Sequence, residues 1–281
     1  MTRMMKYTFA TLLSSSDYLL GVIVLYKSLQ KYGKTQYPFL CVCSKSIKDN
    51  DISKLEKVGI KCKKLSTSAT EDTDLSSQPP EYRRWSNTFD KLLIWGLTEY
   101  DKIVFVDSDM IVLDNLDDLF DKAPFTAVAA GSIYNWNHFN SGLMVVEPDM
   151  GIHNDLISLI PSTIDDILTE KGCVGDEDVV IKYMPDWVEK ENLHLHEGYN
   201  MIFRGMTEYH RKMGFNYGKN IKVVHFIGPW YDKPWNHSLW KVFYHLVGYF
   251  LHNRYGLKAY IAYQRMLWRY RISNNIRNVF K

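Results

Sequence analysis

The sequence predicts an α/β protein with a mainly parallel, doubly wound central sheet and a helical C-terminal extension. Apolar runs rich in β-branched and aromatic residues alternate with amphipathic stretches, which is typical of parallel sheets covered by helices on both faces. The chain has 281 residues, a length that fits one large domain of this class. After Pro234 the pattern is helical to the end. We therefore expect a single Rossmann-like domain over residues 1–235 and a separate extension over residues 236–281.

The N-terminal part of the predicted domain begins with a strand and a helix. Tyr7–Leu13 is a continuous apolar run, whereas Tyr18–Lys31 repeats its apolar residues at the three- and four-residue spacing of a helix. Tyr37–Cys43 is a second apolar strand, and Asp51–Val58 is a short helix. Ser66–Pro80 is polar, rich in Ser and Thr and ends in two prolines, which indicates a loop.

Helices and strands continue to alternate beyond this loop. Trp85–Leu97 has one apolar side and a glycine at its end, which predicts a helix. Lys102–Val106 is a five-residue apolar strand that runs directly into Asp107. Three strands and one helix complete the predicted domain: Thr126–Ala130, Gly142–Val146, Asp149–Leu168 and Val223–Ile227. Ligands of such sheets bind beyond the carboxyl ends of the strands, so polar residues at these ends are the first candidates for a site.

The composition is that of an ordinary globular protein. Hydrophobic residues make up 46% and charged residues 23% of the chain, which excludes long disorder, a collagen-like sequence and a disulfide scaffold. The net charge of +2 points to no particular partner, and we expect no nucleic acid among them. No uncharged run approaches the roughly 20 residues that a membrane span needs. The start of the chain lacks a small-residue cleavage pattern, so we expect a core strand there and no signal peptide.

The cysteines indicate a reducing compartment. None of the four forms a C-x-x-C motif, which argues against a zinc knuckle or a thioredoxin-type site. Cys41 and Cys43 are two residues apart in a predicted strand, so they should point to one face as small buried residues. Reduced thiols are the simplest interpretation, and we expect a cytoplasmic protein.

The C-terminal segment is strongly basic. From Lys233 to Lys281 it contains nine of the 34 basic residues and none of the 32 acidic ones. It also contains twelve aromatic residues between Trp235 and Phe280. A solvated helical face would explain this pattern, but so would an association surface. Of the associations, we place a homodimer ahead of contact with an anionic membrane.

Alternate acidic residues follow the strand Lys102–Val106. Asp107 and Asp109 stand at its carboxyl end, beside the expected ligand crevice. Hard carboxylate oxygens suit Mn²⁺ or Mg²⁺ carrying a diphosphate. A turn in which aspartate caps the next helix would explain the same residues. The pair Asp117-Asp118 downstream is interpreted as the start of a helix and not as a second metal site.

A second polar segment surrounds His225. This histidine lies inside an apolar strand, where a buried core histidine is the simpler explanation. Gly228 permits close backbone approach, and Lys233 supplies a point charge five residues later. Because Mn²⁺ accepts imidazole beside carboxylates, His225 becomes a candidate ligand together with the two aspartates.

Two further segments carry polar groups at element ends. Asn140 and Ser141 open a predicted strand, where they could bond a sugar, although Asn-Ser-Gly is also a frequent turn string. Asp176 and Glu177 precede an apolar run, and a helix N-terminus would explain these acids equally well.

These four segments, in this order and spacing, resemble glycosyltransferase family eight, and its glycogenin-like members in particular. The matching strings are a strand ending in D-x-D, then F-N-S-G, then an acidic pair opening a helix, then V-V-H-F-x-G followed by K-P-W. The resemblance covers residues 7 to 235. It implies a GT-A fold, a nucleotide-diphosphate-sugar donor, Mn²⁺ with Mg²⁺ as a substitute, and retention of the anomeric configuration.

The resemblance also implies roles for individual residues. Asp107, Asp109 and His225 match the metal ligands. Asp176 is the acid expected closest to the reacting centre, and Lys233 should neutralise the departing diphosphate. The remaining donor contacts would come from Leu12, Ser14, Tyr18, Lys91, Asn140, Ser141, Glu177 and Gly228. Three positions depart from the family pattern: Ser15 replaces an asparagine, Glu177 a glutamine and Cys173 an aspartate.

We therefore expect a Mn²⁺-dependent retaining transferase that moves a hexose, in the first place glucose, from a UDP-sugar to a protein or glycan hydroxyl. UDP-galactose is the rival donor. Self-glucosylation on Tyr209 is a further alternative, although a surface tyrosine on a charged helix explains that residue as well. A weak nucleotide-sugar-binding protein is another alternative. A sugar nucleotidyltransferase is disfavoured because no glycine-rich phosphate loop occurs near residues 11–20.

Overall fold

The computed structural model describes residues 5–71, 73, 83–131, 133, 138–171 and 174–279. Their contacts group into two compact units. The first comprises residues 1–16, 37–107 and 117–196, and the second comprises residues 17–36, 108–116 and 197–281. The boundary that we predict at residue 235 lies inside the second unit and stays a prediction.

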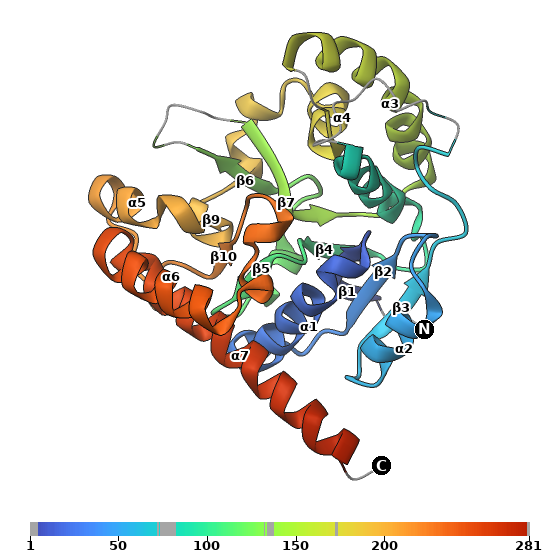
Figure 1. Ribbon diagram of the computed structural model, residues 1–281. Helices are drawn as coiled ribbons and strands as arrows, with labels where there is room; N and C mark the ends of the chain where they lie inside the picture. Colours follow the sequence, from blue (N-terminus) through green and yellow to red (C-terminus); the bar gives the residue numbers. More distant parts are fainter. Residues whose placement is uncertain are drawn as a thin grey trace. The chain divides into compact units, whose positions relative to one another are not determined.

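A seven-stranded sheet forms the centre of the first unit (Figure 1). Its strands, in spatial order, are β3 (Lys61–Lys64), β2 (Phe39–Cys43), β1 (Tyr7–Leu13), β4 (Lys102–Val106), β7 (His138–Val146), β6 (Ala127–Ala130) and β8 (His194–Leu195). Four of its neighbouring pairs are parallel, and only the two pairs that involve β7 are antiparallel. The prediction of an α/β fold with a mainly parallel sheet is therefore confirmed.

The strands β1 and β4 are buried because almost every residue in them is apolar. Phe9, Ala10 and Leu13 of β1 and Val104 and Phe105 of β4 have no exposed surface. The helices of this unit are α2 (Asp49–Glu56), α3 (Met150–Lys171), α4 (Asp176–Tyr183) and the 3-10 helix Arg83–Gly96. α3 packs against both α4 and the 3-10 helix, and the sheet with these helices encloses the main hydrophobic core.

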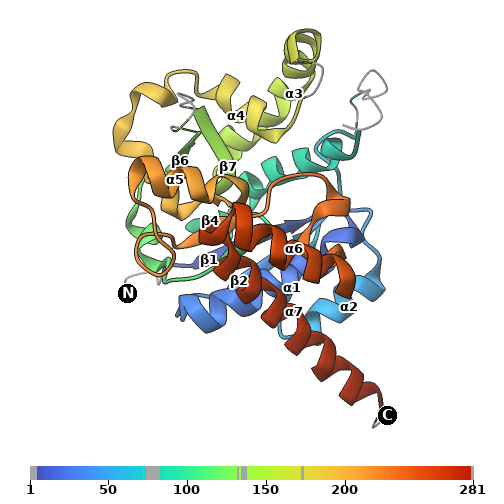
Figure 2. The same cartoon turned by 60° about the vertical axis from the view of Figure 1, so that its left-hand side comes forward.

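The second unit contains a small sheet and most of the C-terminal helices. Its strands are β5 (Met110–Val112), β10 (Val223–His225) and β9 (Met201–Ile202), with β10 in the middle. Its helices are α1 (Leu19–Ser28), α5 (Met206–Met213), α6 (Leu239–His252) and α7 (Arg254–Val279). The predicted helical character after Pro234 is confirmed, and Figure 2 shows α6 beside α7.

The last helix is an integral part of the second unit. Ala259, Tyr260, Tyr263 and Leu267 of α7 have no exposed surface, and α7 contacts α1, α5 and α6. Removing the chain after Ser238 would therefore remove core side chains along with the basic ones. No helix among the described residues combines the length and the apolarity that crossing a membrane requires.

The cysteines behave largely as the sequence predicts. Cys41 and Cys43 are buried free thiols in β2 with their Sγ atoms 3.8 Å apart. Cys62 of β3 pairs in register with Cys41 and is partly exposed. These three residues gather at one end of the sheet. Cys173 lies outside the described residues.

Gly21 of α1 fills a position that has no room for a side chain. A Cβ atom there would lie 2.5 Å from the carbonyl oxygen of Ser108 and 3.0 Å from the ring of Trp235. We expect Gly21→Ala to lower the free energy of unfolding by about 1–3 kcal/mol, because the backbone of the neighbouring segment would have to move.

Urea unfolding measures this effect, and Gly248→Ala is its matched control. Gly248 lies inside α6 with nothing within 4 Å of the added Cβ. There the substitution should stabilise the helix by about 1 kcal/mol. Equal and favourable effects of the two substitutions would contradict the close contact at Gly21.

Candidate active site

The D-x-D segment crosses from one unit to the other. Asp107 follows β4 and belongs to the first unit, whereas Ser108 and Asp109 belong to the second. Each aspartate takes part in a cluster of buried and partly buried polar side chains within its own unit. The chain itself joins the two clusters, since only Ser108 separates the two aspartates.

Lys91 is the centre of the cluster in the first unit. Its Nζ lies 3.0 Å from Oδ1 of Asp107 and 3.0 Å from Oδ2 of Asp176. It also donates a hydrogen bond of 3.1 Å to the hydroxyl of Ser141. Burial opposes the charge of Lys91, but the two carboxylates outweigh this effect and raise the pKa of Lys91. The lysine therefore stays charged and fixes both acids beside the end of β4.

Glu177 approaches the same cluster from α4. This helix begins at Asp176, and the N–H of Gly175 donates a hydrogen bond to the carboxylate of Asp178. The predicted helix N-terminus is therefore confirmed. The Oε2 atom of Glu177 accepts the N–H of Ser141 at 3.0 Å. Asn140 and Ser141 lie within β7, which begins at His138, and Oδ1 of Asn140 accepts the N–H of Gly142.

The protonation of Glu177 follows from its surroundings. Burial raises the pKa of Glu177 to about 8, and the nearby Asp176 acts in the same direction, against the hydrogen bond from Ser141 and the charge of Lys91. At neutral pH this carboxyl group is therefore mostly neutral. In that form it carries a donor and an acceptor, as an amide side chain does.

The cluster in the second unit consists of Asp109, His225 and Lys233. Oδ1 of Asp109 lies 3.1 Å from Nε2 of His225, and Oδ2 accepts a hydrogen bond of 2.5 Å from Nζ of Lys233. All three residues are buried. Burial alone would raise the pKa of Asp109, but Lys233 and His225 outweigh it and lower that pKa well below its usual range.

The donor set of this second cluster fits a divalent metal. Nδ1 of His225 lies 2.9 Å from Oδ1 of Asn200, and because an amide oxygen only accepts, Nδ1 carries the proton. The lone pair of Nε2 then faces Oδ1 of Asp109. Because both atoms are acceptors, either a second proton or a cation must lie between Nε2 and Oδ1. Carboxylate oxygen with imidazole nitrogen suits Mn²⁺, and a hydrogen bond to the far ring nitrogen is the usual support of a metal-binding histidine.

Asn200 was not foreseen from the sequence. It is 3% exposed and stands 25 residues before His225, with no motif around it. The two meet because β9, which begins at Met201, runs parallel to β10. Only the pairing of these short strands reveals the contact.

The remaining predicted donor contacts lie near the ends of β1 and β10. Leu12 is a buried residue of β1, and Ser14 directly follows that strand. Nζ of Lys233 lies 5.8 Å from the centre of the Tyr18 ring. Gly228 has a φ of 125°, a backbone conformation that favours glycine. The two clusters thus include eight of the predicted site residues: Lys91, Asp107, Ser141, Asp176, Glu177, Asp109, His225 and Lys233.

Tyr209 is not the surface tyrosine that the charge of its helix suggests. Its side chain is 1% exposed, and its ring packs edge-on against Phe215. The charged residues near it in the sequence lie on the other sides of α5. A high local charge in the sequence therefore does not show that the Tyr209 side chain is exposed. An acceptor hydroxyl must reach the donor sugar, and this burial weighs against Tyr209 in that role.

The chain is similar to known proteins over most of its length. The model of the family "Glycosyl transferase family 8" matches residues 10–238. Mouse glycogenin-1 is 31% identical over 243 residues, which are 84% of this chain and 67% of that protein. Inositol phosphorylceramide glucuronosyltransferase 1 of Arabidopsis thaliana is 32% identical over 182 residues, or 65% of this chain and 31% of that protein.

Solved structures agree on the fold. The galactosyltransferase LgtC, in complex with donor and acceptor sugar analogues, superposes with a TM-score of 0.57 at 16% identity and covers 94% of this chain and 96% of its own. The glycosyltransferase GlyE of Streptococcus pneumoniae gives a TM-score of 0.56 at 18% identity over 96% of this chain and 65% of its own. At these identities the likeness is one of fold. The family match over residues 10–238, with the relatives that share it, shows that this chain is a glycosyltransferase and belongs to glycosyltransferase family 8.

Proposed function

We propose that the chain transfers glucose from UDP-glucose, with retention of configuration and dependence on Mn²⁺, to the hydroxyl of a separate protein or glycan. The observation that carries this proposal is the pair of buried clusters joined through Ser108, one around Lys91 and the other around Asp109. In this proposal Asp107, Asp109 and His225 hold the metal, for which Mg²⁺ could substitute. The metal would supply positive charge to the diphosphate.

The side chains of the protein have separate tasks in this reaction. The bond from the anomeric carbon to the β-phosphate oxygen breaks, and the electron pair leaves with UDP. Lys233, buried beside Asp109, offers a fixed positive charge to the departing phosphate. The acceptor oxygen forms the new bond on the same face, and its proton passes to the departing phosphate. Asp176, held in place by Lys91, stabilises the positive charge that develops at the anomeric carbon.

The acidic groups favour a neutral donor sugar. Relatives include proteins named as UDP-glucuronate-using enzymes of Arabidopsis thaliana. Here the only cation of the first cluster, among the described residues, is Lys91, and it already pairs with Asp107 and Asp176. A donor carboxylate would therefore meet acidic side chains without a free cation. UDP-galactose remains the rival, because the C4 hydroxyl alone distinguishes it from UDP-glucose.

Release of UDP from a panel of UDP-sugars, with Mn²⁺ and with a chelator, tests this proposal. We expect the fastest release from UDP-glucose and none with the chelator. A clear preference for UDP-galactose or UDP-glucuronate in competition would overturn the donor. Intact-mass analysis after the incubation tests the acceptor: an unmodified chain beside measurable UDP release supports a separate acceptor, whereas a ladder of hexose additions lost on Tyr209→Phe would overturn it.

Glu177→Gln should change the pH dependence more than the rate at neutral pH. The pKa of about 8 keeps the wild-type carboxyl mostly protonated at pH 7, so the amide replaces a neutral group of the same shape. We expect the variant to keep at least about half of the UDP release at pH 7. Above pH 8 the wild type gains a charge next to Asp176 and loses activity, while the variant does not.

The measurement is the pH profile of UDP release for both proteins between pH 6 and 9.5. Glu189→Gln is the control, because this glutamate lies in a separate 3-10 helix, Trp187–Glu189, away from the cluster. Identical alkaline limbs in the wild type and Glu177→Gln would contradict the assignment of this limb to Glu177.

A further inference from the structure

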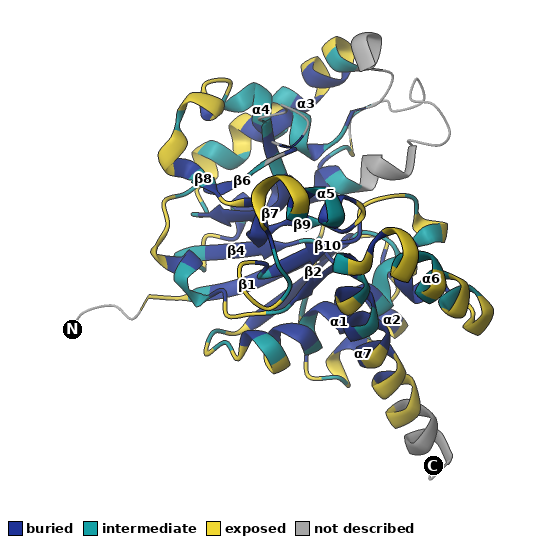
Figure 3. Cartoon of the chain, turned by 90° about the vertical axis from the view of Figure 1, so that its left-hand side faces the viewer, coloured by how far each residue is buried: buried dark blue, intermediate teal, exposed yellow. Residues whose placement is uncertain are grey.

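Helix α6 presents an apolar face over which none of the described residues packs. Its exposed residues Leu239, Trp240, Phe243, Tyr244, Phe250 and Leu251 are 60–82% accessible. They recur at helical spacing, so they lie along one side of the helix. Figure 3 shows α6 in the colours of exposed and intermediate residues, in contrast to the buried strands. Large apolar side chains at this density mark an interaction surface.

The opposite side of α6 is anchored to its own unit. The rings of His245 and Tyr249 contact Tyr260 of α7, with centroids 6.2 and 5.0 Å away. Tyr260 itself has no exposed surface. The helix begins at a regular cap, where the hydroxyl of Ser238 accepts the N–H of Lys241. The exposed face therefore belongs to a helix that is held to its own unit by its other side.

The segment that carries this apolar face is basic. Lys241 lies on α6, and Arg254 and Lys258 follow at the start of α7. The whole segment from Lys233 onward contains no acidic residue. Two acids outside this segment are already paired: Asp232 contacts Arg204 and Lys241, and Glu208 of α5 contacts Lys212.

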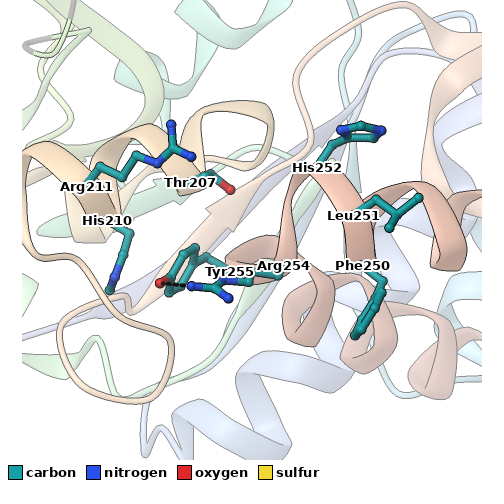
Figure 4. A pocket seen from close by; sticks show the side chains of 8 residues that line it. All are labelled: Thr207, His210, Arg211, Phe250, Leu251, His252, Arg254 and Tyr255. Carbon is teal, nitrogen blue, oxygen red and sulfur yellow. Dashed lines mark hydrogen bonds between the residues drawn. The ribbon is translucent and has the colours of Figure 1, made fainter.

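A basic cavity lies where α6 ends. It has a volume of about 740 Å³ and lies between α5 and the junction of α6 with α7. Figure 4 shows Arg211 and Arg254 among its lining side chains, with His210 and His252. Phe250 and Leu251 line it as well, so the cavity continues the apolar face. Two guanidinium groups at the edge of an apolar surface suit a phosphate group at a lipid–water boundary.

We propose that α6 docks this protein on an anionic lipid surface, with the aromatic face in the headgroup region and a lipid phosphate in the cavity beside Arg211 and Arg254. Amphipathic helices with aromatic and aliphatic side chains on one face and cations beside them bind in this way. A symmetric dimer through the same face would bring together two segments that have no acidic residue from Lys233 onward. This docking is independent of the proposed donor and acceptor.

Co-sedimentation with vesicles tests the docking of the full chain. We expect binding to vesicles of equal phosphatidylcholine and phosphatidylglycerol at low salt, and little binding to phosphatidylcholine alone. The combined variant Trp240→Ser, Phe243→Ser, Phe250→Ser should bind at least roughly tenfold more weakly, since burial of even one large apolar side chain is worth about a factor of ten. Trp268→Ser is the matched control, because Trp268 is 42% exposed on α7 but lies outside the α6 face.

A second pair of substitutions tests the cavity. Arg211→Gln with Arg254→Gln should weaken binding to the anionic vesicles and make it less dependent on salt. Unchanged thermal unfolding of every variant shows that the fold is kept. No binding of the wild type to anionic vesicles at low salt would overturn the proposal. A dimer in sedimentation velocity that the triple variant dissociates, or equal binding to both vesicles, would also overturn it.

Discussion

Asp109→Asn is expected to abolish sugar transfer. Asp109 is 8% exposed, with one oxygen facing Nε2 of His225 and the other accepting a hydrogen bond from Lys233. The amide removes the negative charge that both partners, and the proposed metal, require. We expect UDP release to fall at least ~10³-fold, because the group that holds charge against the leaving diphosphate is lost. UDP release and circular dichroism together separate this effect from unfolding.

Asp117→Asn is the matched control for this prediction. Asp117 begins a 3-10 helix eight residues after Asp109, and it carries no role in the proposed site. The control should keep nearly all activity, with a stability change of about 1 kcal/mol at most, as for other residues at helix starts. Full activity of Asp109→Asn in the presence of a chelator would rule out the metal and the role of this carboxylate together.

Lys91→Met should destabilise the protein most at neutral and alkaline pH. Without the ammonium group, Asp107 and Asp176 would remain near each other with no cation between them. Breaking a buried ion pair by removing one partner costs about 3 kcal/mol or more. In the variant the two carboxylates should have raised pKa values, so its folded state takes up protons more readily than its unfolded state and gains stability as the pH falls.

The wild type differs because Lys91 keeps its charge between pH 5 and pH 8. The pKa of Lys91 is raised above its ordinary value, so the stabilisation by Lys91 is complete below about pH 10 and is lost only above it. Urea unfolding at pH 5 and pH 8 should therefore give a larger difference between variant and wild type at pH 8. Lys182→Met, which removes an exposed pair with Asp166, should cost less than about 1 kcal/mol at both values. If Lys91→Met lowered the free energy of unfolding by the same amount at pH 5 and pH 8, that result would contradict the charge cluster.

The elements predicted from the sequence are those whose residues are both periodic and apolar. The strands β1, β2 and β4 and the helices α1 and α3 have this property. β3 was missed because three of its four residues are lysines, and it becomes a strand only by pairing with β2. β5 and β9 are two or three residues long, and they depend on β10 for their hydrogen bonds. Tertiary pairing decides such short segments, and local preference does not.

In the candidate site, too, the sequence predicts some features and the tertiary structure decides others. The residues of the D-x-D and H-F-x-G strings are visible in the sequence because they stand at strand ends. The environments of these residues are not visible there. The neutral state of Glu177 depends on burial, the burial of Tyr209 depends on the packing of α5, and the support of His225 by Asn200 depends on strand pairing. These three features come only from the folded chain.

The three thiols at the edge of the sheet provide a chemical probe of local opening. The pKa of Cys62 is lowered, because the thiols of Cys41 and then Cys43 hydrogen-bond to its sulfur. Cys62 is partly exposed, whereas Cys41 and Cys43 are fully buried. An alkylating reagent should therefore label Cys62 first in the folded protein. Labelling of the other two should wait until β3 separates from β2, so that mass spectrometry of the alkylated chain counts how often this edge of the sheet opens.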